Sequence, residues 1–111
     1  MESTTQQFKR CDLVKATGRI DAHTAPQLTE VFAAITEAGR FRIVFDMSEV
    51  DYISSAGLWV LIDTRRTCRR FNRGDLVLAS VSPQVHRALE LAGFHTLFGV
   101  YETTVEAVGS F

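Results

Sequence analysis

Hydrophobic residues near the start of the chain recur at almost every second position, which is typical of strands half buried in a sheet. Val14, Ala16 and Ile20 show this spacing, with Phe8 and Leu13 beside it. We therefore expect two short strands within residues 7–20, joined by a tight turn near residues 11 and 12. The polar residues 1–5 are expected to be loose.

A spacing of three and four residues follows and predicts the first helix. Thr24-Ala25-Pro26-Gln27 reads as a capping box with proline in the first turn, and Gly39 is a C-terminal breaker. The apolar positions between them form one stripe, expected to be buried: Leu28, Val31, Phe32 and Ile35.

The next apolar run, residues 41–45, is nearly continuous and predicts a central parallel strand covered on both faces. The connection after it, residues 46–51, contains Asp46, Glu49 and Asp51. A divalent cation site needs a tighter pattern of ligands. We therefore interpret this connection as a solvated acidic loop without a metal.

Residues from Ser55 onward predict a second helix, whose faces follow from a turn of about 100° per residue. The expected core face holds Gly57, Val60, Leu61, Thr64, Cys68 and Phe71. Leu58 and Ile62 project outside that arc, and Trp59 lies nearly opposite to it. Trp59 is expected either to be partly buried under a neighbouring loop or to form a contact patch with Leu58 and Ile62.

Arginines crowd the second half of this helix, at Arg65, Arg66, Arg69, Arg70 and Arg73. They complement the negative end of the helix dipole. A nucleic-acid site would be accompanied by a basic chain or by aromatic residues for base stacking, and neither is found. The cluster is interpreted as a solvated face.

The last third of the chain alternates between strand and helix patterns. Residues 72–75 predict a turn, residues 76–81 a strand, Ser82-Pro83 the start of a helix that ends at Gly93, and residues 94–100 a short extended segment. A capping box at residues 103–106 opens a final short helix. After the first hairpin, this alternation predicts an α/β fold with parallel strands and right-handed helical crossovers.

Composition limits the classes of function. The 111 residues are 46% hydrophobic, enough for a single domain, and 12 basic against 13 acidic residues give no general attraction to nucleic acid or to an anionic membrane. The longest apolar stretch, residues 56–62, is too short to span a bilayer, and no signal peptide is recognised. We expect a cytoplasmic protein in which Cys11 and Cys68 are buried free thiols.

Two serines are the main candidates for a chemical role. Phosphate-binding glycine loops and a Gly-x-Ser-x-Gly elbow do not occur, and His23, His86 and His95 lack metal-ligand spacing. Ser54 and Ser55 stand where a loop becomes a helix. A serine there either caps the helix or carries a phosphate that meets the positive end of the helix dipole.

Three blocks, in order, resemble the STAS domain of bacterial anti-sigma factor antagonists. They are GRIDAHTAPQL at residues 18–28, IVFDMSEVDYISSAGLWVL at residues 43–61 and LVLASVSPQVHRALELAGF at residues 76–94. The resemblance implies an α/β fold with a small mixed sheet of about four to five strands, the first of them antiparallel, and four helices.

The resemblance also implies a function. Family members are not enzymes. They bind an anti-sigma factor that is also a serine kinase, which frees a sigma factor, until the kinase phosphorylates a serine at the start of the second helix. A serine phosphatase resets the cycle. Aligned on Gly57, Ser55 takes the phosphorylated place, Ser54 stands where an aspartate is common, and Ala56 replaces a second hydroxyl residue. Ser54 is the alternative acceptor.

The family motif further implies that Asp21 and Asp46 lie near this serine loop. The expected partner-binding residues are Asp21, Thr24, Asp46, Ser54, Ser55, Ala56, Gly57, Leu58, Trp59 and Ile62. We expect no cofactor, no direct contact with nucleic acid or membrane, and a monomer or weak dimer. The alternative is an adaptor subunit of a signalling or lipid-transport assembly that lacks the switch. A small hydrolase would need a base within reach of Ser55.

Overall fold

The computed structural model describes residues 1–70 and 74–111. A mixed sheet runs in the order β1-β2-β3-β4-β5, in which β1 is antiparallel to β2 and the later neighbours are parallel. Its strands are Glu2–Gln7 (β1), Asp12–Ile20 (β2), Arg42–Ile53 (β3), Asp75–Ala79 (β4) and Val100–Tyr101 (β5). The helices are Ala25–Glu37 (α1), Ser55–Arg70 (α2), Pro83–Leu91 (α3) and Thr104–Gly109 (α4). The predicted fold class is confirmed.

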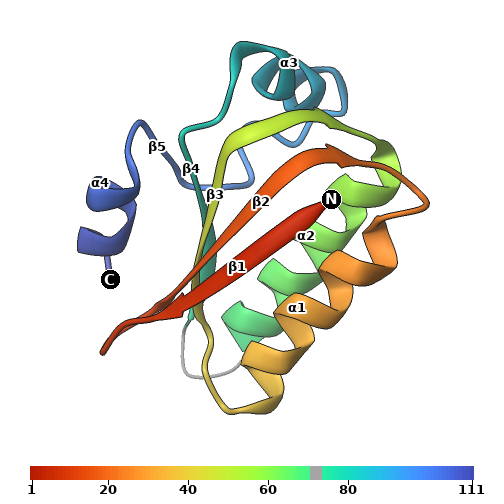
Figure 1. The fold of residues 1–111 in the computed structure, drawn as a ribbon. Helices are drawn as coiled ribbons and strands as arrows, with labels where there is room; N and C mark the ends of the chain where they lie inside the picture. Colours follow the sequence, from red (N-terminus) through yellow and green to blue (C-terminus); the bar gives the residue numbers. More distant parts are fainter. Residues whose placement is uncertain (71–73) are drawn as a thin grey trace.

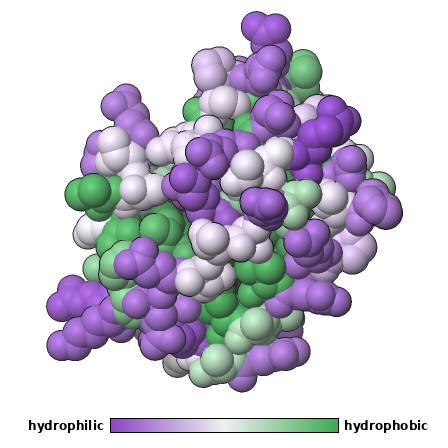
Figure 2. Space-filling view, viewed as in Figure 1, coloured by the Kyte–Doolittle hydropathy of each residue, from purple (hydrophilic) through white to green (hydrophobic). Residues whose placement is uncertain are grey.

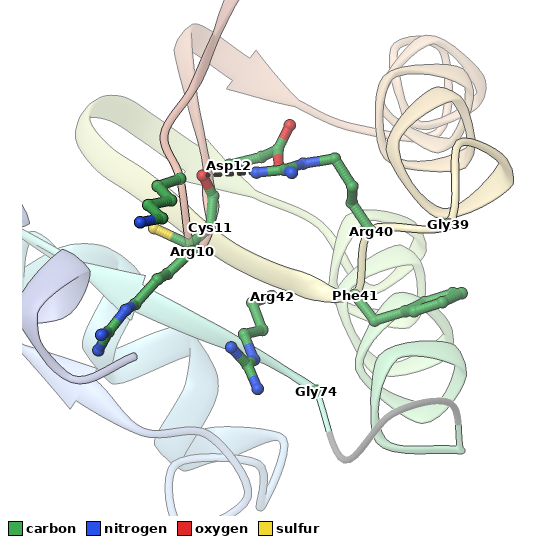
Figure 3. A pocket seen from close by; sticks show the side chains of 9 residues that line it. Arg10, Cys11, Asp12, Gly39, Arg40, Phe41, Arg42 and Gly74 are labelled. Carbon is green, nitrogen blue, oxygen red and sulfur yellow. Dashed lines mark hydrogen bonds and ion pairs between the residues drawn. The ribbon is translucent and has the colours of Figure 1, made fainter.

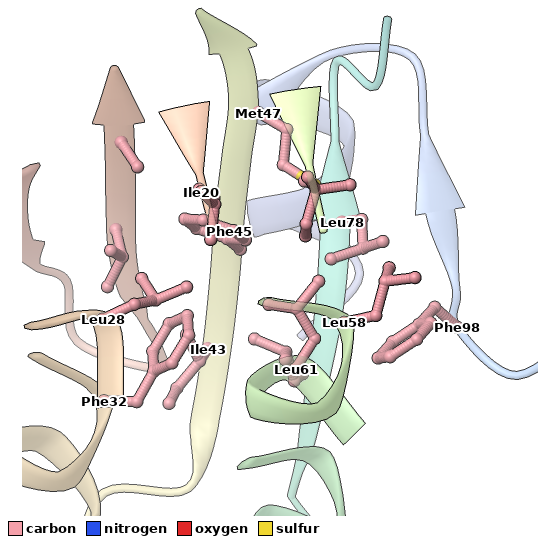
Figure 4. Close-up of a cluster of buried hydrophobic side chains, with 14 of the residues drawn as sticks. Ile20, Leu28, Phe32, Ile43, Phe45, Met47, Leu58, Leu61, Leu78 and Phe98 are labelled. Carbon is pink, nitrogen blue, oxygen red and sulfur yellow. The ribbon is translucent and has the colours of Figure 1, made fainter. Parts of the chain in front are cut away.

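Helices cover both faces of the sheet (Figure 1). The larger core cluster lies under α1, α2 and α3, where Phe32 meets Phe45 edge to face with ring centroids 5.3 Å apart. Figure 4 shows Leu58 and Leu61 of α2 directed into this cluster beside Leu78 of β4. A smaller cluster on the other face joins Ala107 of α4 to Val44 and Val77. The sheet therefore lies between two layers of helices.

The first strand differs from the prediction, because residues 1–5 are not loose. Glu2–Gln7 forms the edge strand β1, which pairs with β2 from Glu2↔Thr17 to Gln7↔Asp12. The turn between them is at residues 8–11, where the Phe8 N–H donates to the Cys11 carbonyl at 2.8 Å. This strand is polar and mostly exposed, so it carries no apolar alternation that a sequence pattern can detect.

The acidic connection predicted at residues 46–51 is also wrong, because β3 continues through it to Ile53. Its pairing with β2 is irregular, with register shifts between Lys15 and Thr17 and between Gly18 and Arg19. Such irregularities disturb the alternation of inward and outward side chains. In the sequence, a strand with that pattern therefore resembles a loop.

The buried face of α2 is rotated from the predicted one. Leu58 and Ile62 are buried at 4% and 3% exposure, while Val60 and Thr64 are only partly buried. The helix is covered on more than one side, since Leu58 and Ile62 share a cluster with Val85 of α3 and with Phe98. The prediction that Leu58 and Ile62 project outside the core is therefore wrong. Phe71, also assigned to the core face, lies outside the described residues.

The three predicted helix starts are confirmed in position, but only two of the three predicted side-chain caps form. The Ser82 hydroxyl accepts from the Val85 N–H at 3.2 Å, and the Thr103 hydroxyl accepts from the Glu106 N–H at 3.2 Å. Thr24 has helical backbone angles and its side chain makes no cap. Residues 72 and 73 of the predicted turn, and Arg73 of the arginine cluster, lie outside the described part of the chain.

The surface is mostly hydrophilic on the side viewed in Figure 2, with hydrophobic side chains gathered in small groups. None of the described helices combines the length and the apolar character that a membrane crossing requires.

Candidate functional site at the start of helix α2

The start of α2 is fixed to the end of the sheet. Ile53 ends β3 beside Ile20 of β2, and the Ser54 N–H donates to the Ile20 carbonyl at 2.8 Å. Gly57 then brings the helix backbone against the two isoleucines, because a β-carbon there would lie 2.6 Å from Ile20 Cγ2 and 2.8 Å from Ile53 Cγ1. Residues 54 and 55 are thereby held on a rigid support.

The two serines have different environments. The Ser54 carbonyl accepts from the Leu58 N–H at 3.0 Å, and its hydroxyl lies 3.4 Å from the Gly57 nitrogen, as in a long helix cap. The Ser55 side chain is exposed and makes no hydrogen bond within the described residues. A cap and a free hydroxyl thus stand side by side.

Helix α1 starts at the same edge of the sheet, because β2 and β3 are parallel and end together. The Asp21 carboxylate accepts from the N–H groups of His23 and Thr24 at 3.0 and 3.1 Å. The Thr24 hydroxyl accepts from the Asp21 N–H at 2.9 Å and lies 3.1 Å from the Arg19 carbonyl, to which it donates. The Asp21 side chain therefore stabilises the turn that leads into α1, whose N-cap residue Thr24 makes no side-chain bond to the helix.

These hydrogen bonds set the charge of Asp21. The Thr24 N–H, more than any other group, lowers the pKa of Asp21, with smaller contributions from the His23 N–H, the Thr24 hydroxyl and the Arg19 charge. Burial acts in the opposite direction. Asp21 is a fixed negative charge on the loop next to the serines.

Arg19 and Tyr52 form a contact that sequence reasoning missed. The Arg19 guanidinium carbon lies 4.4 Å from the centre of the Tyr52 ring, and its Nε is 3.9 Å from Asp21 Oδ2. Arg19 and Tyr52 are direct neighbours on β2 and β3. That register includes a shift at Gly18, so no regular spacing could have revealed the pair.

Asp46 does not join this group. It is 8% exposed, lies eight residues before Ser54, and faces Lys15 on β2 and Ala79 on β4. Its carboxylate accepts from the Ser48 N–H at 2.9 Å, and within the described residues it makes no bond to Asp21, Ser54 or Ser55. This bond lies where the pairing of β2 and β3 changes register.

Trp59 lies one helical turn after Ser55, so the two side chains share a face of α2. Trp59 is 49% exposed, and its ring meets the edge of Phe94, which follows α3, with centroids 5.8 Å apart. Trp59 is therefore partly buried against a neighbouring segment, as the first interpretation expected, whereas the expected patch with Leu58 and Ile62 does not form because both are buried. We call Ser55, Trp59 and Phe94 the Ser55 surface. Ala56 beside it is half-buried, and Gly57 is buried.

The site does not resemble a nucleophilic centre. In the described part of the chain, no histidine or acidic side chain bonds to the Ser55 hydroxyl, and no group of three metal-ligating side chains comes together. A nucleophilic serine is activated by an adjacent base. An exposed hydroxyl at a helix start, without a base beside it, is instead accessible to the active site of another protein.

Comparisons with known proteins identify the family of this domain. The family model described as STAS domain matches residues 3–107. The chain is 35% identical to BtrV of Bordetella bronchiseptica over 85% of this chain and 80% of that protein. It is 31% identical to the anti-sigma-B factor antagonist of Staphylococcus aureus over 94% of each.

Solved structures share the fold. An anti-sigma factor antagonist from Mycobacterium paratuberculosis superimposes with a TM-score of 0.86 at 24% identity, covering 98% of this chain and 92% of that one. The Bacillus cell fate determinant SpoIIAA in its phosphorylated form gives 0.75 at 16% identity, covering 98% of each. The matched family model and the two relatives together show that the chain belongs to the STAS domain family.

Proposed function

We propose that the chain is an anti-sigma factor antagonist. It binds an anti-sigma factor that is also a serine kinase, releases a sigma factor, and is switched off by phosphorylation of Ser55. The observation that carries the proposal is the exposed, unbonded Ser55 hydroxyl at the start of a rigidly held helix. Relatives that share 31% identity and carry the name anti-sigma-B factor antagonist support it.

The phosphate is assigned to Ser55 because the hydroxyls of Ser54 and Ser55 differ in burial and in hydrogen bonding. Ser54 is half-buried and turned toward the Gly57 N–H, so modifying its hydroxyl would disturb the helix cap. Ser55 can accept a phosphate without loss of a hydrogen bond. Ser54 stands where an aspartate is common in the family motif, and aspartate is also a preferred cap residue.

Phosphorylation would change charge more than shape. A phosphate adds about −1.5 to −2 charges and three acceptor oxygens, and the N–H groups of the first helical turn stabilise part of this charge. Asp21 nearby is ionised, because its hydrogen bonds lower its pKa. A partner surface that contacts the neutral serine would meet repulsion and desolvation. A loss of about 3 kcal/mol weakens binding more than a hundredfold.

Trp59 supplies the apolar anchor of the same surface. Tryptophan is enriched among the residues that dominate binding energies. Its ring is held by Phe94 and half of it stays accessible. The partner would therefore cover Trp59 and Ser55 together. A serine phosphatase would complete the cycle, and the chain itself would have no catalytic role.

The test uses the kinase partner and ATP. After incubation, mass spectrometry should map one phosphate to Ser55. Binding should be retained by Ser55→Ala and weakened at least tenfold by Ser55→Asp. Thr5→Asp is the matched control, since it adds the same charge at an exposed hydroxyl of β1, and it should bind like the wild type.

Equal affinity of the wild type, Ser55→Ala and Ser55→Asp would contradict the switch. Tight binding by all three would point to the adaptor alternative, in which a STAS domain holds its partner constitutively. A phosphate found on Ser54 would leave the function in place but overturn the assignment of the acceptor.

A further inference from the structure

Strand β1 forms an open edge of the sheet. The strand order ends at β1 on one side and at β5 on the other, and in Figure 1 no helix or loop of the described residues lies in front of β1. Five of its six residues are exposed. An edge strand displays unpaired N–H and C=O groups, to which a further strand can form hydrogen bonds. This edge is therefore available to another chain.

The hydrogen bonds of the β1–β2 hairpin determine which backbone groups of β1 point outward. The Phe8 N–H donates to the Cys11 carbonyl at 2.8 Å, so these two residues form a bonded pair. In an antiparallel ladder, bonded pairs alternate with pairs that do not bond to each other. The register therefore turns the N–H and C=O groups of every second residue away from β2, namely those of Ser3, Thr5 and Gln7.

The two edges of the sheet differ in how they are protected. Strand β5 has only two residues, and α4, which follows it, packs against the sheet. Short edge strands, proline and lysine are common devices that prevent pairing at an edge. Strand β1 has six residues, none of which is proline, glycine or lysine. Thr4 and Thr5 at its centre favour an extended backbone. The β1 edge therefore lacks the protection that the β5 edge has.

Strand β1 is also fixed at both ends. At its start, Gln27 Nε2 of α1 donates to the Met1 carbonyl at 3.3 Å, and Met1 packs against the larger core cluster. At its end, Arg40 donates to the buried Asp12 carboxylate and to the Phe8 carbonyl, which holds the β1–β2 turn (Figure 3). A preorganised strand loses little conformational entropy when another strand pairs with it.

Charges at the two ends of β1 favour a second copy of the same chain. Glu2 lies at one end, whereas Lys9 and Arg10 follow the other end in the turn. All three are exposed, and within the described residues none makes an ion pair. When two identical strands pair in antiparallel fashion, the Glu2 end of each meets the cationic turn of the other. A formal net charge of −1 per chain opposes this association only weakly.

We propose that two copies of this chain associate through β1, antiparallel and with Thr5 on the two-fold axis. Ser3 of each copy then pairs with Gln7 of the other, and Thr5 pairs with Thr5. Each of these three pairs exchanges two hydrogen bonds, so about six bonds join the two five-stranded sheets into one. Strand β2 separates this edge from β3, which leads to Ser55. The dimer and the antagonist function can therefore be tested separately.

Sedimentation velocity of the full chain, from about 10 μM to about 1 mM, is the first test. An interface of one strand pair is small, and small interfaces are weak, so the dimer should form toward the upper end of this range. Added NaCl should weaken it, because the charge pairs at both ends are exposed. Sedimentation as a monomer at every concentration would overturn the proposal.

Hydrogen exchange at low and at high protein concentration tests which backbone groups pair. The outward N–H groups of Ser3, Thr5 and Gln7 should exchange rapidly in the monomer and more slowly in the dimer. The N–H groups of Thr4 and Gln6 are the matched control in the same strand, because they are directed toward β2, and their exchange should not depend on concentration. A dimer in which Thr5 exchanges as rapidly as in the monomer would use another surface and would overturn the proposal.

Charge reversal tests the antiparallel orientation. Glu2→Lys and Arg10→Glu should each weaken dimerisation about three- to thirtyfold, because each dimer loses two exposed charge pairs. An equimolar mixture of the two variants should associate about as well as the wild type, since each supplies the charge that the other requires. Glu30→Lys is the matched control, because Glu30 on α1 is also exposed and has no ion pair among the described residues.

Two results of this experiment would contradict the proposed pairing. The first is a mixture that associates no better than either variant alone, and the second is an equal loss in Glu30→Lys. Circular dichroism of each variant checks that a loss of association is not a loss of fold.

Discussion

Gly57 of α2 lies against Ile20 of β2 so closely that a β-carbon on Gly57 would be 2.6 Å from Ile20 Cγ2. The second obstacle is Ile53 Cγ1, at 2.8 Å. Both atoms are attached directly to a β-carbon, so neither can move away without a rotamer change or a backbone shift. This contact determines where α2 begins and hence where Ser55 lies.

Gly57→Ala is therefore expected to destabilise the fold. Overpacking of a core typically costs about 1–3 kcal/mol, of which the better helix propensity of alanine recovers up to about 1 kcal/mol. Urea unfolding should show a lower midpoint. Gly109→Ala is the control, since that glycine is also a helical residue, the last of α4, but its β-carbon would meet nothing within 4 Å. An equal midpoint for the two variants would contradict the close contact.

Alanine substitutions should separate the two serines by stability alone. Ser54→Ala removes a helix cap and should cost about 0.5–1 kcal/mol, the low end of the usual range because the bond is long at 3.4 Å. Ser55→Ala removes a hydroxyl without a partner and should leave the unfolding midpoint unchanged. Ser54→Asp should restore or exceed wild-type stability, since a carboxylate caps well at a helix N-terminus. A larger loss in Ser55→Ala than in Ser54→Ala would reverse the assignment.

Sequence patterns predicted the elements that depend on interactions between residues close together in the chain. The Ser82 and Thr103 caps depend on bonds across three residues, and the stripe of α1 on its own periodicity, so both could be read without a structure. The edge strand β1 and the second half of β3 depend on their neighbours. Polar β1 is held by its ladder to β2, and β3 continues through a shift of register, which no single-strand pattern contains.

The candidate site shows the same division. Ser54 and Ser55 could be placed at a helix start, but their separate roles required the hydrogen bonds. Leu58 and Ile62 were assigned to the surface because an angular pattern assumes one buried side, whereas α2 is packed against more than the sheet. The Arg19–Tyr52 contact combines residues far apart in the sequence. Such combinations follow only from the register of the strands.

The Asp12–Arg40 pair should be strongly asymmetric under mutation. Arg40→Ala leaves a buried carboxylate unpaired and removes the bonds to two carbonyls, so a loss of about 3–5 kcal/mol is expected. Asp12→Asn leaves Arg40 bound to the carbonyls of Phe8 and Cys11 and keeps an acceptor oxygen, so its cost should be smaller. Chemical denaturation measures both variants. Equal losses would mean that the carbonyl bonds contribute little.

The two cysteines should make the protein less stable at high pH. Burial raises the pKa of Cys68 from 9.0 to about 12, with a further contribution from Asp75. Burial and Asp12 also raise the pKa of Cys11, against the effect of Arg40. The unfolded chain loses these protons first, so the stabilisation is complete below about pH 9 and is lost as pH rises toward 12.

Urea midpoints between pH 8 and pH 11 test this prediction, compared with the double variant Cys11→Ala, Cys68→Ala, which should show a weaker pH dependence. Other groups that titrate in this range affect both proteins equally. At pH 8 a thiol reagent should label neither cysteine in the folded state and both in urea. Rapid labelling of the folded protein would show that the thiols are accessible.

Trp59 is the single tryptophan of the chain, so its fluorescence reports directly on the Ser55 surface. With 49% of the side chain exposed and one edge on Phe94, its emission should lie between that of a buried and a free indole. Phe94→Ala should shift the emission to the red and cost more than the about 0.5–1.5 kcal/mol that an aromatic pair contributes beyond the area it buries, because Phe94 also packs against the core cluster.

Binding of the anti-sigma factor should shift the same emission to the blue, because the partner excludes water from the exposed edge of the ring. The titration is carried out with a partner variant that lacks tryptophan, and Trp59→Phe serves as the blank. Protein phosphorylated at Ser55 should show no shift at the same concentration, since Ser55 and Trp59 share one face of α2 and the phosphate prevents docking there. A complex that forms without changing the emission would mean that the partner binds elsewhere on the domain.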